Sequence, residues 1–312
     1  MRASGEAATY QAMDTSTAGM QPGSKARLPA GTHIGRVRLR VGDLGRSLRF
    51  YRDILGFRVA RDQGSTVGLT PEPDGERELI VLEERPGIHR RPSRPVTTGL
   101  YHVALLVPSR RELGRALLGL HAAQYQLRGM SDHGVSESLY LDDPDGNGLE
   151  IYADRPRSEW PVQDGVIQLK VDPMDVQGVI SAAGKPSDPW RGLPAGTVVG
   201  HVHFTVSDLD RAVRFYRDVI GFDTMMRIPS LAAVSAGGYH HHLNLNTWAG
   251  EGAGADSDQV AGLEGWELRV PDERGRRELI DRLATAGALT GSPDSAEARD
   301  PDAILLSIND AP

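Results

Sequence analysis

The stretch GHVHFTVSDLDRAVRFYRDVIGF (200–222) repeats an earlier stretch of the same chain, GRVRLRVGDLGRSLRFYRDILGF (35–57). The constant offset of 165 residues, from 35 to 200, places His201 opposite Arg36. A guanidinium stays protonated and has no lone pair for a metal, so Arg36 cannot act as a ligand. The chain is therefore an internal duplication in which some copies have lost residues that could support metal chemistry.

Each copy has the pattern of one strand followed by a helix and further strands. Residues 37–41 alternate apolar side chains with arginines, which predicts a half-buried strand. Asp43 then precedes apolar residues at helical spacing, and Gly56 follows them, as expected for the N-cap and C-cap of a helix. Short strand-like runs follow, up to the segment ELIVLEE (78–84).

The same pattern recurs twice more with lower identity, in LYHVALLVPSRRELGRALLGLHAAQ (100–124) and LEGWELRVPDERGRRELIDRLATAG (263–287). The sequence thus predicts an α+β protein of four tandem βαβββ modules. The predicted ranges are a flexible N-terminal tail (1–32), a first domain (33–156, with modules at 33–85 and 99–154), a linker with a short helix (157–196) and a second domain (197–312, with modules at 198–248 and 262–310).

Composition limits the class of protein. The 312 residues are 39% hydrophobic, which is enough chain for two domains with their own cores. A net charge of −7 without a dense basic stripe argues against nucleic acid and anionic membranes as partners. Neither a membrane span nor a signal peptide is evident, so we expect a cytoplasmic protein. Because cysteine is absent, any metal must be held by nitrogen and oxygen ligands.

The modules resemble the vicinal oxygen chelate superfamily, which contains glyoxalases, bleomycin resistance proteins and extradiol dioxygenases. The FYRD-type helix ends and the segment DPDGNGLEIY (143–152) carry this resemblance. GLYHVALLVPS (99–109) and SAGGYHHHLNLNTW (235–248) are similar to the bacterial catechol 2,3-dioxygenase-like branch. The resemblance covers about residues 33–312. It implies that the four modules pair into two cup-shaped mixed β-sheet domains. It also implies that such a cup holds a divalent metal, Fe(II) in ring-cleaving members, with Mn(II) as the alternative.

A mononuclear iron site that binds both substrate and O2 needs two histidines, one carboxylate and open positions. The superfamily takes its ligands from the first and last strands of its modules. These positions hold His102 and Glu150 in module two, His201 in module three, Arg36 in module one, and Gly265 and Ser307 in module four. Each residue taken alone has an ordinary structural or surface explanation, but only His102, Glu150 and His201 together form the required set.

The ligand positions make a prediction about architecture. We favour modules two and three sharing one metal cup, which leaves the cup of modules one and four without metal. The alternative is that consecutive modules pair and split the ligands between two incomplete cups.

The resemblance also implies catalytic side chains around the metal. Tyr140 lies ten residues before Glu150, where the family has a tyrosine that contacts a substrate hydroxyl. His133 lies upstream on the same predicted hairpin. Both residues are expected to hydrogen-bond the substrate oxygens.

Three consecutive histidines, 240–242, offer candidates for acid–base chemistry. Strand alternation predicts that His240 and His242 share one face while His241 points the other way. We assign the acid–base role to His242 and make His240 the second candidate. A surface metal-binding tract or a structural strand is the alternative interpretation.

The activity that the resemblance implies is extradiol cleavage. An aromatic diol of the catechol type and O2 would react at the metal to give a hydroxymuconic semialdehyde. Two other classes stay open: a glyoxalase-type metal-dependent isomerase or lyase, and a non-catalytic, resistance-type binding protein. The predicted partners are these small molecules, with assembly into a homo-oligomer left open.

Overall fold

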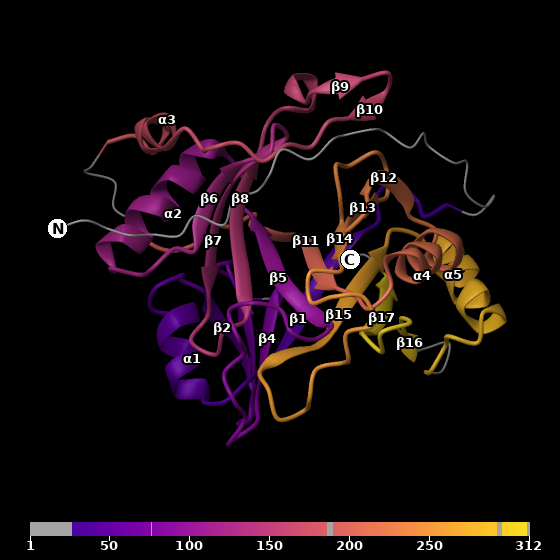
Figure 1. Cartoon of the computed structure of the whole chain (residues 1–312). Helices are drawn as coiled ribbons and strands as arrows, with labels where there is room; N and C mark the ends of the chain where they lie inside the picture. Colours follow the sequence, from indigo (N-terminus) through magenta and orange to yellow (C-terminus); the bar gives the residue numbers. More distant parts are fainter. Residues whose placement is uncertain (1–26, 76, 186–189, 292–294, 311–312) are drawn as a thin grey trace.

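The computed structural model describes residues 27–75, 77–185, 190–291 and 295–310. In Figure 1, helices α1 and α2 lie on one side of the strands and helices α4 and α5 on the other. Within the described residues, no helix combines the length and apolar character needed to cross a bilayer.

The elements follow the predicted order. Module one contains β1 (His33–Val41), α1 (Leu44–Tyr51), β2 (Arg58–Asp62), β3 (Thr66–Thr70) and β4 (Ile80–Glu84). Module two contains β5 (Gly99–Leu106), α2 (Arg110–Ala122), β6 (Gly129–Asp132), β7 (Ser136–Asp142) and β8 (Gly148–Asp154). Module three contains β11 (Val198–Thr205), α4 (Leu209–Arg214), the π-helix η2 (Phe215–Ile220), β12 (Asp223–Ile228), β13 (Leu231–Ser235) and β14 (Leu243–Asn246). Module four contains β15 (Gly262–Val270), α5 (Glu273–Thr285), β16 (Glu297–Arg299) and β17 (Leu305–Asp310).

The linker between modules two and three has more structure than a single helix. It contains the 3-10 helix η1 (Arg157–Glu159), the strands β9 (Val162–Gln163) and β10 (Val166–Ile167), and the helix α3 (Val176–Ala182). The two strands pair as an antiparallel hairpin, and α3 packs on α2. The hairpin is a feature that the sequence analysis does not anticipate.

The strands form two curled mixed sheets, and their order settles which modules pair. The eight-stranded sheet has the order β12-β13-β14-β11-β5-β8-β7-β6, and the seven-stranded sheet has the order β16-β17-β15-β1-β4-β3-β2. Module two therefore pairs with module three, through the antiparallel contact of β11 and β5, as we favoured. Modules one and four pair through β1 and β15. Each sheet therefore contains one module from the predicted first domain and one from the predicted second domain. The domain ranges along the chain stay a prediction.

Local sequence explains why the repeated helices begin and end where they do. The Asp43 carboxylate accepts a hydrogen bond from the Arg46 backbone N–H at 2.7 Å, and Asp208 does the same for Arg211 at 2.9 Å. These are N-caps, which satisfy donors that have no partner inside the helix. Gly221 ends the third module's helix at φ 102°, a left-handed conformation that glycine adopts without steric cost.

The FYRD helix ends anchor one module to the next within each half of the chain. The Tyr51 hydroxyl donates to Asp143 Oδ2 at 3.1 Å, and the Tyr216 hydroxyl donates to Asp300 Oδ2 at 2.9 Å. Burial raises the pKa of each of these two carboxyls to about 6. The repeated tyrosine and the aspartate that opens each DPD turn thus hold consecutive modules together.

Part of the predicted N-terminal tail falls within the described residues. Residues 1–26 lie outside them, whereas Leu28 is buried and its backbone N–H donates to the Gly221 carbonyl at 3.0 Å. Residues 27–32 are therefore packed against the rest of the chain.

Candidate metal centre

Three side chains converge at the centre of the eight-stranded sheet. His102 comes from β5, Glu150 from β8 and His201 from β11, and these three strands are adjacent. His102 Nε2 lies 3.0 Å from Glu150 Oε2, and His201 Nε2 lies 3.2 Å from the same oxygen. All three residues are buried, and their ligand atoms lie within 4.8 Å of one another. The cross-strand pairing of modules two and three therefore assembles the predicted set.

The electrostatics of the cluster favour an ionised Glu150 carboxylate and a neutral His102 imidazole. Burial raises the pKa of Glu150, but the nearby imidazoles of His201 and His102 outweigh burial and hold that pKa well below its usual value. Burial lowers the pKa of His102, and the neighbouring Glu150 carboxylate only partly offsets this effect. For Glu150 and His102, these are the protonation states that metal binding requires.

The donor set fits a divalent metal ion. Two ligand atoms bound at about 2.1 Å and at right angles lie about 3 Å apart, which matches the separations of the two imidazole nitrogens from Glu150 Oε2. Despite its short contact with Glu150, the buried His102 Nε2 lacks a hydrogen bond of proper geometry to any described residue. Two imidazoles and one carboxylate form the facial triad typical of non-heme iron, with further coordination positions open.

A cavity of about 1630 Å³ opens onto the triad. It exceeds the roughly 300–1,000 Å³ of ordinary ligand pockets, so a small molecule would fill only part of it. The walls come from modules two and three, the latter including β12 and β13. Linker residues between 163 and 172, which include most of the β9–β10 hairpin, complete the walls. The linker therefore forms part of the wall of the site.

Tyr140 and His133 lie together in this cavity, as predicted. His133 Nδ1 lies 2.8 Å from the Lys170 carbonyl, which can only accept, so Nδ1 carries the proton. In the neutral ring, His133 Nε2 then accepts from the Tyr140 hydroxyl at 2.6 Å. This arrangement directs the Tyr140 proton toward His133, so that a tyrosine lone pair can accept a hydrogen bond from a bound ligand.

His241, and not His240 or His242, is the one of the three consecutive histidines that lines the cavity. His241 lines the cavity, and its ring centroid lies 4.3 Å from that of His201. His242 is not a lining residue, because its Nδ1 contacts Ser235 Oγ at 2.8 Å and its ring stacks on Phe222. Because β14 begins only at Leu243, strand periodicity does not extend across residues 240–242 and does not determine which of the three histidines lines the cavity.

His240 is also absent from the cavity lining. Its Nε2 lies 2.8 Å from Asp154 Oδ1, and its Nδ1 lies 2.8 Å from His241 Nδ1. The acid–base roles predicted for His242 and His240 stay predictions, and His240 contacts the cavity-lining His241.

His203 is a lining residue that the sequence analysis misses. Its ring centroid lies 4.9 Å from that of His102, and the Asn246 amide nitrogen contacts its Nε2 at 2.8 Å. Burial lowers the pKa of His203 well below its usual value, and the neighbouring His102 adds to this effect. The signal was present, because His203 follows His201 by two residues on a strand and so shares its face.

The equivalent face of the seven-stranded sheet carries arginine–carboxylate pairs in place of ligands. Arg36 Nη1 lies 3.1 Å from Glu78 Oε2, and Arg36 Nε lies 3.4 Å from the buried Glu267. Gly265 has no side chain to offer, and the Ser307 hydroxyl lies 3.3 Å from the Trp266 carbonyl. Arg36, Gly265 and Ser307 therefore do not form a set like that of His102, Glu150 and His201, and a metal-free second cup stays a prediction.

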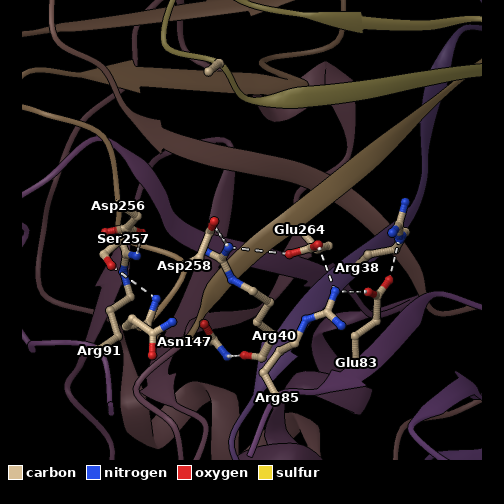
Figure 2. A network of polar contacts seen from close by, with 12 residues as sticks. Arg38, Arg40, Glu83, Arg85, Arg91, Asn147, Asp256, Ser257, Asp258 and Glu264 are labelled. Atoms are coloured by element: carbon tan, nitrogen blue, oxygen red, sulfur yellow. Dashed lines mark hydrogen bonds and ion pairs between the residues drawn. The ribbon is translucent and has the colours of Figure 1, made fainter. Parts of the chain in front are cut away.

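Figure 2 shows how the network continues along the same strand. It links β1 and β4 to β15 and to the loop before β15 through alternating charges, in the order Arg38, Glu83, Arg85, Glu264, Arg40 and Asp258. Opposite charges thus neutralise one another on this face of the seven-stranded sheet. The equivalent face of the eight-stranded sheet carries the candidate metal ligands.

Arg36→Ala is expected to lower the free energy of unfolding by about 1–2 kcal/mol, because Glu78 and the buried Glu267 lose a cationic partner while Arg36 itself is partly exposed. The metal content should not change. Urea unfolding measures the first effect and elemental analysis the second. Arg52→Ala is the matched control, since solvent screens the exposed Arg52–Asp53 pair and its loss should lower the free energy of unfolding less than the loss of Arg36 does. An equal loss in both variants would contradict a structural role for Arg36.

The fold and site define the class of protein. The family model of the glyoxalase/bleomycin resistance protein/dioxygenase superfamily matches residues 33–151 and 198–297. The chain belongs to this superfamily.

Curated relatives are dioxygenases. Catechol-2,3-dioxygenase of Bacillus subtilis (strain 168) is 42% identical over 274 residues, which are 86% of this chain and 94% of that protein. Biphenyl-2,3-diol 1,2-dioxygenase 3 of Rhodococcus globerulus is 33% identical over 116 residues, 37% of this chain and 60% of that protein.

Solved structures share the fold at low identity. A Bacillus subtilis protein has a TM-score of 0.61 at 15% identity and covers 92% of this chain and 87% of its own. Glyoxalase I from Zea mays has a TM-score of 0.54 at 16% identity and covers 90% of this chain and 92% of its own. These likenesses support the architecture alone.

Proposed function

We propose that the protein is an extradiol ring-cleaving dioxygenase that acts on a catechol-type diol and gives a hydroxymuconic semialdehyde-type product. The observation that carries this proposal is the buried triad of His102, Glu150 and His201 at the wall of a large cavity. The 42% identity to a catechol-2,3-dioxygenase over most of both chains supports it. We further propose Fe(II) as the metal, with Mn(II) as the alternative, and the cytoplasm as the location.

The triad residues would hold the ion through two imidazole nitrogens and one carboxylate oxygen. When bound, the ion supplies Lewis acidity toward the diol and redox chemistry with O2. The protein's contribution is to fix the ligand set on three adjacent strands, so that little rearrangement is needed. Burial of the cluster limits access of water to the site.

Tyr140 and His133 would bind one hydroxyl group of the diol. Because the Tyr140 proton is directed toward His133 Nε2, the tyrosine oxygen accepts a hydrogen bond from the substrate hydroxyl. The substrate hydroxyl would pass its proton to the Tyr140 oxygen while the Tyr140 proton moves to His133 Nε2, so that the Tyr140 hydroxyl then donates to the resulting substrate oxyanion. The Lys170 carbonyl can accept from His133 Nδ1 both before and after this transfer.

Oxygen uptake tests the proposed activity. The protein is loaded with Fe(II) under anaerobic conditions, mixed with catechol and then exposed to O2. We expect stoichiometric uptake of O2 and a yellow semialdehyde product. Metal binding without O2 uptake would point to an isomerase or lyase, and catechol binding without a metal requirement would point to a binding protein. Either result would overturn the proposal.

A further inference from the structure

A chain of hydrogen-bonded side chains leads from the cavity to the far end of β8. The Asp154 carboxylate contacts His240 Nε2, His240 Nδ1 contacts His241 Nδ1, and both separations are 2.8 Å. The His241 ring then packs against the candidate ligand His201. Glu150 lies on the same strand as Asp154, four residues earlier and on the same face, so one strand supplies both a ligand candidate and the origin of this chain.

The partners determine where the ring protons lie. An ionised carboxylate only accepts hydrogen bonds, so His240 Nε2 carries a proton. In a neutral His240 ring, Nδ1 is then the acceptor, and the close contact between the two Nδ1 atoms requires His241 Nδ1 to be the donor. The remaining nitrogen of His241, Nε2, is left with its lone pair. Nε2 has no hydrogen-bond partner among the described residues, and its ring lines the cavity.

Packing keeps the His240 ring in place. His240 is fully buried, and its ring centroid lies 4.0 Å from that of Tyr239 and 5.2 Å from that of Trp160. The geometry therefore favours one arrangement of protons along the chain.

We propose that Asp154 and His240 are positioning residues that fix the tautomer of His241, so that His241 presents an unprotonated Nε2 to the ligand cavity beside His201. This Nε2 accepts a hydrogen bond from a hydroxyl group of the bound ligand. The role of that ligand as a diol rests on the proposed function, whereas the arrangement of protons does not. His240 would thus act on the site indirectly, by fixing the tautomer of His241.

NMR of the metal-free protein with ¹⁵N-labelled histidine tests the proposal directly, because long-range ¹H–¹⁵N correlations show which ring nitrogen carries the proton. His241→Gln assigns the His241 signals. We expect Nδ1–H and unprotonated Nε2 for His241 in the native protein. Asp154→Leu should yield a mixture of His241 tautomers. Asp154→Asn should keep the native tautomer, because its amide oxygen can accept the same N–H.

The matched control is His242→Gln, which changes another buried histidine of the same segment and should leave the His241 tautomer unchanged. If Asp154→Leu does not fold, His240→Phe tests the same link. Three results would each overturn the proposal: protonated Nε2 on native His241, two protons on His240, or a native tautomer in the variants that break the chain. After metal loading, Asp154→Leu should lower kcat/KM for catechol about 2- to 13-fold, with rescue by Asp154→Asn. An inactive native protein with the expected tautomer would refute the proposed function and leave the positioning role intact.

Discussion

Replacing His102, Glu150 or His201 by alanine is expected to abolish stoichiometric metal binding and to reduce ring cleavage by more than about 100-fold. A facial triad has no spare protein ligand, so two remaining donors hold a divalent ion weakly. The fold should persist, because the core of the eight-stranded sheet does not depend on these three side chains. Elemental analysis after anaerobic loading with Fe(II), together with oxygen uptake, measures both effects, and circular dichroism checks the fold.

His121→Ala is the control for this experiment, since His121 is an exposed histidine near the end of α2 and outside the site. It should retain one metal ion per chain. Among the three ligand variants, His201→Ala is the most informative, because His201 is the member that module three supplies. Full metal content and turnover in that variant would contradict a site shared between modules two and three.

The second large effect is expected for the hydrogen-bonded pair of Tyr140 and His133. Tyr140→Phe should retain the metal and lower kcat/KM for catechol about 2- to 150-fold, because it removes one hydrogen bond to a substrate oxygen that becomes charged. His133→Gln should retain the metal too and produce a smaller loss, since it disturbs the orientation of the tyrosine hydroxyl without removing it.

The two changes combined should be far from additive. Because His133 is proposed to act through the Tyr140 hydroxyl, adding His133→Gln to Tyr140→Phe should cost little more than Tyr140→Phe alone. Steady-state kinetics of the four proteins in this cycle measure the coupling. Fully additive losses would mean that His133 contacts the substrate independently.

The sequence by itself determined the repeat, the order of strands and helices in the modules, and the set of candidate ligands. A constant offset between the two FYRD copies set His201 opposite Arg36, and the resemblance to the superfamily pointed to His102 and Glu150. The order of elements can be read from the sequence because strand and helix periodicity are local properties of the chain. The position of Tyr140 ten residues before Glu150 likewise places both residues on paired strands of one hairpin.

Only the tertiary structure decided which modules share a sheet and which histidine faces the cavity. All four modules have the same strand–helix pattern, so local sequence does not distinguish pairing of neighbours from the observed pairing of β5 with β11. Strand alternation does not determine which of His240–His242 lines the cavity, because these residues precede β14 and contacts with Asp154 and Ser235 orient two of the three rings. The linker's place in the cavity wall is likewise a long-range contact, which periodicity along the chain does not encode.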